Sequence, residues 1–231
     1  MNFQSLYNKF YTHKEGFWIM KPENAQALYK FVKEHDIKNV LDLGTGIGCS
    51  AAVIALALKE KGVEFHIDTV EQDEKCVNLA KELIPQELQE NISIFHQPVK
   101  VWNHEKIPYT YFSTFAELPE VAGGYQLVVC DGPGPYLESG NYIDLPNGDV
   151  LKMLFEDKVK PGTFIFFDGR IQALSYIERY FAENFYILEW ARRCHIIERK
   201  EGVVKFGDLK KEDIARVGYF HADEQTNKTT T

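Results

Sequence analysis

Several features that mark membrane, secreted or zinc-binding proteins are missing from this chain of 231 residues. No apolar run reaches the roughly 18 residues that a membrane-spanning helix needs. The first residues show neither the basic flank nor the apolar core of a signal peptide. The four cysteines lie far apart with no C-x-x-C pair, which argues against a zinc site and against a disulfide framework. We therefore expect a cytoplasmic protein with reduced cysteines and no membrane contact.

Positive charge is also scarce. The chain has 26 Lys and Arg against 34 Asp and Glu, which gives a net charge of −8. Non-specific binding to nucleic acid depends on clustered Lys and Arg. The basic stretches at residues 191–200 and 209–216 are interpreted as solvated faces. The composition therefore disfavours extended nucleic acid as a partner, and it carries no information on oligomeric state.

Strand-like and helical patterns alternate along most of the chain, which has enough apolar residues for one domain of ordinary size. The expected main strands cover residues 39–43, 64–71, 91–97, 125–132, 163–169, 185–190 and 194–200. The expected helices cover residues 21–35, 50–61, 73–84, 149–158 and 171–184. This alternation predicts an α/β protein with a Rossmann-like, doubly wound, mostly parallel seven-stranded sheet and helices on both faces.

One segment interrupts the alternation after the third strand. Residues 99–114 alternate on both sides of a polar NHEK turn, which predicts an inserted β-hairpin. We expect a single domain over residues 1–222, in which residues 1–35 form an N-terminal helical cap. The polar residues 223–231 are predicted to be a disordered tail.

Acidic residues stand at the ends of four predicted strands. Asp42, Glu71, Asp131 and Asp168 each close an apolar run. Because ligands bind at the carboxyl ends of the strands in open parallel sheets, these acids are expected to lie around one site. This repetition is the strongest functional signal in the sequence.

A glycine-rich turn follows the first of these acids. Gly44, Gly46 and Gly48 let the backbone turn sharply and approach a ligand, and the next helix offers its free N–H groups to an anion. The stretch GIGCSA also satisfies the dinucleotide fingerprint G-x-G-x-x-G/A. However, Asp42 would oppose a pyrophosphate at this turn, whereas it suits a ligand that carries an amino group.

These stretches resemble the motifs of class I S-adenosylmethionine-dependent methyltransferases, in particular bacterial members with unassigned substrates. VLDLGTGIG is similar to their first motif and TVEQDEKCVNLAKELI to their second-strand motif, while YQLVVCDGPG and KPGTFIFFDG are similar to their fourth and fifth strands. The resemblance implies S-adenosylmethionine as cofactor, with its ammonium near Asp42, its carboxylate near the helix start and its ribose hydroxyls on Glu71. The implied cofactor-binding set is Asp42, Gly44, Thr45, Gly46, Gly48, Glu71, Gln72, Gln97 and Asp131.

The adenine contact departs from the family pattern. Many members place an acid after the third strand to receive the adenine amino group, but this chain reads HQPVK there. Gln97 or a backbone carbonyl would have to serve, and His96 is a second candidate for lining the site.

The resemblance also implies a small-molecule methyl acceptor, with Asp131 and Asp168 as the candidate catalytic residues. They are similar to the acids of catechol-type O-methyltransferases, which hold a divalent cation with an adjacent Asn. Here Gly169 follows Asp168, so we expect no metal site. DGPGPY replaces the asparagine-proline-proline-aromatic motif of nitrogen-methylating enzymes, which favours oxygen as the acceptor atom. Loop aromatics such as Tyr136 and Tyr142 suit a flat or apolar acceptor.

Three other interpretations stay open at this point. An aminopropyltransferase of the spermidine synthase kind shares the fold, but usually carries a GGGDGG turn and an Asp-Ser or Asp-Thr pair after the fourth strand. A nicotinamide oxidoreductase would share the glycine pattern. A non-catalytic cofactor-binding protein would keep every binding residue without turnover, since fold and site do not prove activity.

Overall fold

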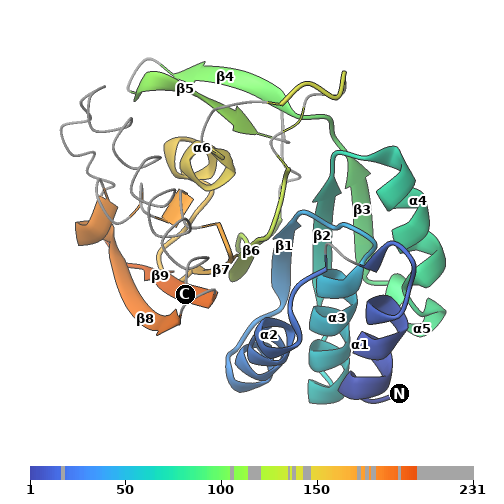
Figure 1. Ribbon diagram of the computed structural model, residues 1–231. Coiled ribbons are helices and arrows are strands. Elements are labelled where there is room, and N and C mark those ends of the chain that lie inside the picture. The colour runs from blue at the N-terminus through green and yellow to red at the C-terminus, as the bar shows by residue number, and fades with distance from the viewer. Residues whose placement is uncertain are drawn as a thin grey trace, which may run out of the picture.

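The computed structural model describes residues 1–16, 19–104, 107–113, 121–134, 136, 139–142, 147–170, 173, 174, 177, 181–191 and 194–201. Figure 1 shows these residues in colour. The described part of the chain does not include Phe17, Trp18 or the predicted tail at 223–231. It also does not include the side chains of the predicted hairpin from residue 102 onward.

A seven-stranded sheet forms the centre of the protein, as the sequence predicts. Its strands are β1 (Asn39–Leu43), β2 (His66–Glu71), β3 (Ile92–His96), β6 (Leu127–Cys130), β7 (Phe164–Asp168), β8 (Phe185–Ala191) and β9 (Cys194–Arg199). They lie in the order β3-β2-β1-β6-β7-β9-β8 (Figure 1). The first five in this order run parallel, and β9 pairs antiparallel with both β7 and β8.

The strand order creates a crevice at the middle of the sheet. From β1 the chain moves outward through β2 and β3, then returns to place β6 on the other side of β1. Such a reversal leaves an opening at the carboxyl ends of the two central strands, where ligands bind in this type of sheet. The central strands are buried on both faces, which explains why β6 reads as a continuous apolar run.

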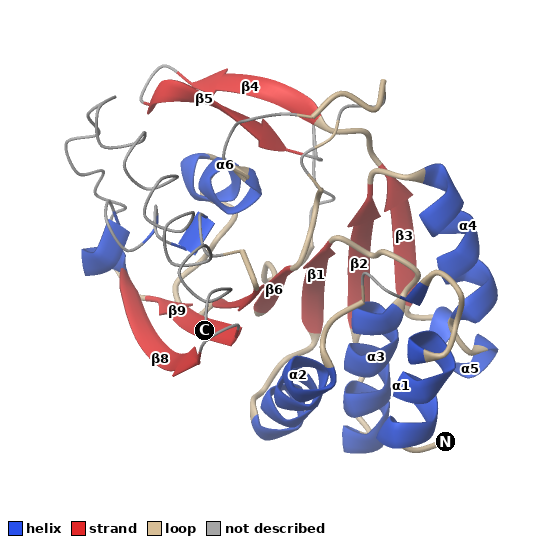
Figure 2. Ribbon diagram, in the orientation of Figure 1, coloured by secondary structure: helices blue, strands red, loops and turns tan. Residues whose placement is uncertain are grey.

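Five helices are assigned to the first 90 residues. They are α1 (Phe3–Tyr11), α2 (Pro22–Glu34), α3 (Cys49–Lys61), α4 (Glu74–Leu83) and the short α5 (Gln86–Gln89). Figure 2 shows α1, α2 and α3 side by side against one face of the sheet. Every residue of α3 from Cys49 to Leu58 is buried, because α1 and α2 cover the sides of this helix that the sheet leaves open.

The other face of the sheet is covered by α6 (Asp149–Phe155) together with Ala173, Leu174, Ile177 and Phe181. These side chains pack on strand residues that include Leu41 and Val128. After Phe181, a 3-10 turn, η2 (Ala182–Asn184), leads into β8. The two faces therefore carry separate apolar cores.

The predicted hairpin is present as a second, two-stranded sheet. β4 (Lys100–His104) and β5 (Ile107–Ser113) pair antiparallel, and β5 contacts α6. The fold class predicted from the sequence, including this insertion, is confirmed. Within the described part of the chain, no helix has both the length and the apolar character to cross a membrane.

Candidate active site

The glycine turn after β1 lies against the loop that follows β6. Gly44 has a φ of 104°, and a Cβ added to it would come within 2.3 Å of the backbone nitrogen of Gly132. The amides of Gly44 and Thr45 donate to the carbonyl of Val70 at 3.0 and 3.2 Å. The turn is therefore fixed between β2 and the loop after β6, and at Gly44 only glycine fits without displacing backbone.

Asp42 lies under this turn and is fully buried. Its Oδ2 accepts hydrogen bonds from the hydroxyls of Ser50 at 2.8 Å and Thr69 at 2.9 Å. Its Oδ1 is buried and finds no hydrogen-bond partner among the described residues. Burial raises the pKa of Asp42 to about 7, against the opposing effect of the two hydroxyl donors. The site thus contains a buried carboxylate oxygen ready to accept a donor from a ligand.

Glu71 closes β2 and connects two loops. One of its oxygens accepts from the amide of Gly46 at 2.7 Å, and the other accepts from the amides of Gln72 at 2.8 Å and Asp73 at 3.0 Å. Burial raises the pKa of this carboxyl, while the three backbone donors act in the opposite direction. Each carboxylate oxygen can accept more than one hydrogen bond, so Glu71 can hold the glycine turn and still receive hydroxyl donors.

Asp131 directly follows β6, Asp168 is the last residue of the neighbouring strand β7, and the two carboxyls interact electrostatically. The pKa of Asp131 is raised well above its ordinary value, first by burial and then by the charge of Asp168, while the Arg170 guanidinium lowers it. Asp168 accepts a hydrogen bond at 2.5 Å from the side-chain amide of Asn24 on α2. The charge of Asp168 therefore favours the protonated form of Asp131, and Arg170 favours its ionised form.

The backbone of Asp131 and Gly132 is held at all four of its polar groups. Both amides donate to the carbonyl of Leu43, at 3.0 and 2.5 Å. The carbonyl of Asp131 accepts from Arg170 Nε at 2.6 Å and also from Arg170 Nη2. The carbonyl of Gly132 accepts from Asn147 Nδ2 at 3.0 Å. This clamp fixes the position from which the Asp131 side chain projects.

Gln72 lies between the end of β2 and the loop after β6. Its Nε2 is 3.6 Å from where a Cβ on Gly134 would be. Its Oε1 is buried and has no hydrogen-bond partner among the residues that the structure describes. The backbone carbonyl of Gln72 is 3.1 Å from His96 Nε2, and the amide of Gln97 donates to Glu71 at 2.8 Å. The predicted residues Gln72 and Gln97 therefore come from adjacent strand ends.

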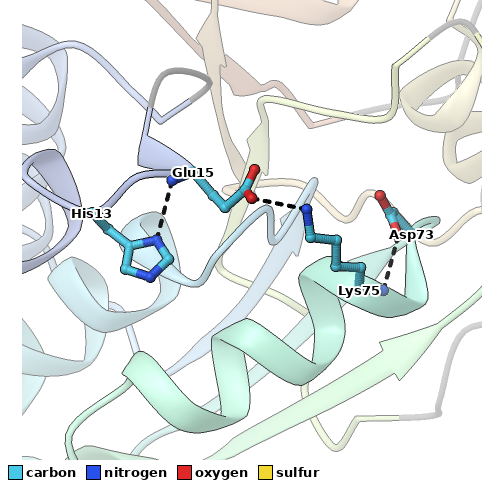
Figure 3. A network of polar contacts seen from close by, with 4 residues as sticks. All are labelled: His13, Glu15, Asp73 and Lys75. Atoms are coloured by element: carbon cyan, nitrogen blue, oxygen red, sulfur yellow. Dashed lines mark hydrogen bonds and ion pairs between the residues drawn. The ribbon is translucent and has the colours of Figure 1, made fainter.

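The N-terminal segment reaches the same edge of the sheet. The Glu15 carboxylate accepts a hydrogen bond from Lys75 Nζ at 2.8 Å, and the Glu15 amide donates to His13 Nδ1 at 3.2 Å. Figure 3 shows both contacts. The Lys75 amide in turn donates to Asp73, the N-cap of α4, at 2.8 Å. The ion pair lowers the pKa of Glu15 and raises that of Lys75. Both side chains are solvated, so the pair adds little stability, but it places residues 13–16 beside the start of α4.

Sequence reasoning missed two residues that support the candidate catalytic acids, Asn24 and Asn147. Each is buried, and each contacts a residue distant in sequence. For Asn24 the available signal was a polar residue on a helical face otherwise formed by Ala25, Leu28 and Val32. Tyr136 and Tyr142, by contrast, form an edge-on pair with ring centroids 5.8 Å apart, and both stay at least half exposed.

The residues present fit the cofactor that the sequence implies. Buried acceptors at Asp42 and Gln72 suit the amino groups of a ligand, and the start of α3, which has no side-chain cap, suits a carboxylate. Within the described ranges, no group of three His, Cys, Asp or Glu side chains is placed to hold a metal ion.

Sequence comparison relates the first half of the chain to a known family of methyltransferases. A family model described as Protein-L-isoaspartate(D-aspartate) O-methyltransferase matches residues 13–123, which include the glycine turn and the end of β2. No curated protein matches the chain by sequence. The family match agrees with the resemblance to class I methyltransferases over the first half of the chain.

Solved structures extend the likeness over most of the chain. The S-adenosylhomocysteine-bound methyltransferase PaMTH1 of Podospora anserina aligns with a TM-score of 0.60 and 13% identity, over 86% of this chain and 88% of that one. An O-methyltransferase of Bacillus cereus aligns with a TM-score of 0.55 and 14% identity, over 86% and 90%. A class I methyltransferase of Listeria monocytogenes aligns with a TM-score of 0.52 and 17% identity, over 95% and 75%. At these identities the likeness is one of fold, and the fold is that of class I methyltransferases.

Proposed function

We propose that this chain, which has the class I methyltransferase fold, transfers a methyl group from S-adenosylmethionine to an oxygen of a small-molecule acceptor. One observation carries the proposal: Asp42, Glu71 and Asp131 lie around one glycine turn, at the point where the strand order reverses. Their charges affect one another's pKa values there. Solved methyltransferases of this fold hold S-adenosylhomocysteine or S-adenosylmethionine, as in the Bacillus cereus enzyme and in TomG of Streptomyces achromogenes.

Each cofactor-binding residue contacts a different part of the ligand. The ammonium fits the buried Oδ1 of Asp42, and its charge would lower the pKa of that carboxyl below the value of about 7. The carboxylate fits the positive end of α3 beyond Gly48, the N-cap of this helix. Glu71 accepts the ribose hydroxyls, as a carboxylate that receives charge-assisted hydrogen bonds. When bound, S-adenosylmethionine supplies an electrophilic methyl group on a good leaving group.

The protein supplies positioning and a proton acceptor. Aligning an acceptor with a reactive group can contribute roughly 7 to 11 kcal/mol, and general-base assistance about 10²- to 10⁴-fold. Asp131 in its ionised form would take the proton of the acceptor hydroxyl, while the acceptor oxygen bonds to the methyl carbon and the bond from that carbon to the cofactor sulfur breaks. The charge of Asp168 beside it favours holding that proton. Asn24 holds Asp168, while Arg170 and Asn147 hold the backbone at Asp131. The edge-on pair of Tyr136 and Tyr142, in the loop that follows Asp131, offers exposed aromatic side chains to the acceptor.

We further propose that residues 1–222 act as one domain with a separate tail at 223–231, and that the protein works in the cytoplasm. An aminopropyltransferase is disfavoured because Gly132 replaces the Ser or Thr that those enzymes carry after the fourth-strand acid. The acceptor is a small molecule in this proposal, since the aromatic pair is compact and the chain is acidic overall.

Titration calorimetry tests the cofactor class without knowledge of the acceptor. The purified protein is titrated with S-adenosylhomocysteine, with decarboxylated S-adenosylmethionine and with NAD. Tight binding of the first and weak binding of the others is the expected result. Preference for either of the others would refute the proposal.

An acceptor screen then tests turnover. The panel includes phenols, small carboxylates and sugars, together with an isoaspartyl peptide because of the family match. Methyl transfer to the peptide alone would replace the small molecule with a protein substrate. Cofactor binding without transfer to any acceptor class would favour a non-catalytic binding protein.

A further inference from the structure

The adenine end of the proposed cofactor lacks the acid that many related proteins use. After β3 the chain presents His96 and Gln97, neither of which is a carboxylate. The exocyclic amino group of adenine is a hydrogen-bond donor and needs an acceptor if it is buried. The question of which residue provides that acceptor rests on the proposed function.

A buried acceptor does exist near this place, on a different strand end. Gln72 follows Glu71 directly, and its Oε1 is enclosed without a hydrogen-bond partner among the described residues. A buried carbonyl oxygen without a hydrogen bond destabilises the folded state, so native proteins rarely leave one without a partner. Gln72 Oε1 therefore lacks a hydrogen-bond donor, and the amino group of adenine is such a donor.

The surroundings of Gln72 keep this side chain at the site. Its own backbone amide donates to Glu71, the residue assigned to the ribose. Its backbone carbonyl is joined to His96 at the end of β3, and its Nε2 lies beside Gly134 in the loop after β6. With Nε2 facing that loop, Oε1 is the end of the amide left for the ligand.

We propose that Gln72 accepts the hydrogen bond of the adenine amino group through Oε1 and thereby selects adenine as the base of the cofactor. Gln97 is the competing candidate, since it follows β3 directly where related proteins carry the acid. Its amide donates to the carbonyl of Glu71 at 2.8 Å, so its backbone lies one strand further from the central crevice than Gln72.

The test combines a change in the ligand with a change in the protein. Calorimetry measures binding of S-adenosylhomocysteine and of its analogue with hydrogen in place of the 6-amino group. In the unaltered protein, loss of the amino group should weaken binding about tenfold, the effect of one hydrogen bond to a buried acceptor. In Gln72→Leu the two ligands should bind within about twofold of each other. Gln97→Leu tests the competing candidate directly, and under the proposal it should keep the tenfold preference.

Each other outcome overturns the assignment. If Gln72→Leu keeps the preference and Gln97→Leu loses it, Gln97 is the acceptor. If both variants keep it, a backbone carbonyl serves. Gln72→Met is measured beside Gln72→Leu, so that a folding defect of one variant does not decide the result, and circular dichroism checks both. If the unaltered protein binds S-adenosylhomocysteine tightly without any amino-group preference, only this inference fails. If it does not bind that ligand, the proposed function fails first.

Discussion

Replacing Gly44 with alanine tests the close approach on which the active-site geometry depends. The backbone φ of 104° at this position is left-handed, and such a conformation costs about 1 to 2 kcal/mol for a residue with a Cβ. The new Cβ would also lie 2.3 Å from the nitrogen and 2.4 Å from the Cα of Gly132, which cannot rotate away as a side chain would. Forcing packed backbone apart typically adds about 1 to 3 kcal/mol. Gly44→Ala should therefore lower the free energy of unfolding by about 2 to 5 kcal/mol.

Gly46→Ala is the matched control for this experiment. Gly46 has a φ of 51°, also left-handed, but an added Cβ would meet no atom of the described residues within 4 Å. This variant should lose only about 1 to 2 kcal/mol. Urea denaturation followed by circular dichroism measures both, as midpoint shifts at constant slope. Equal destabilisation of the two variants would show that the glycine turn and the loop after β6 do not touch as described.

Three further predictions concern the ligand. Glu71→Ala should weaken S-adenosylhomocysteine binding by about 1.5 to 3 kcal/mol, the value of hydrogen bonds to a charged group, and unchanged calorimetric affinity would remove Glu71 from the site. Burial raises the pKa of Asp42 to about 7 and a bound ammonium favours its ionised form, so affinity should rise with pH up to about 7 and proton release should accompany binding. Asp42→Asn should abolish the pH dependence of affinity and the proton release. If the release persists in this variant, the proton comes from another group. Asp131→Asn should lower turnover about 10²- to 10⁴-fold with little change in cofactor affinity, whereas normal turnover would leave Asp131 a structural role.

The raised pKa of Asp42 also has a consequence for stability without ligand. The folded protein keeps the Asp42 proton up to about pH 7, whereas the unfolded chain releases it near the ordinary Asp pKa of 3.8. Because the folded state binds more protons in this window, the contribution of Asp42 to stability is present at low pH and is lost as the pH rises through about 7.

The sheet and the strand-end acids were predictable because they depend on local patterns. Continuous apolar runs identified the buried parallel strands, and an acid at the end of a run must lie at the carboxyl edge whatever the details of packing. This reasoning placed Asp42, Glu71 and Asp131 correctly at adjacent strand ends. The alternation in residues 99–114 likewise predicted the antiparallel pair β4 and β5.

The supporting residues were not predictable from such patterns. Asn24 meets Asp168 only because α2 packs against the face of the sheet at β7, a contact between residues 144 positions apart in the chain. The extent to which α4 is covered could not be predicted for a similar reason. Cys76 and Leu83 lie on the same helix as the buried Val77, but both stay partly exposed, since α4 covers the outer strands near the edge of the sheet. Helical periodicity gives the direction of a face and not the extent of its cover.

The carbonyl of Leu43 accepts hydrogen bonds from two consecutive amides of the loop after β6. These bonds show which part of the loop could be replaced without moving Asp131. The loop beyond Gly134 carries the exposed aromatic pair and is not needed for those bonds. A grafted or evolved loop could therefore begin at Gly134, end before Asn147 and bring a new acceptor, while the acid before it would keep its place relative to the glycine turn. Selectivity and chemistry would be separable parts of this scaffold, with the boundary between them a few residues after β6.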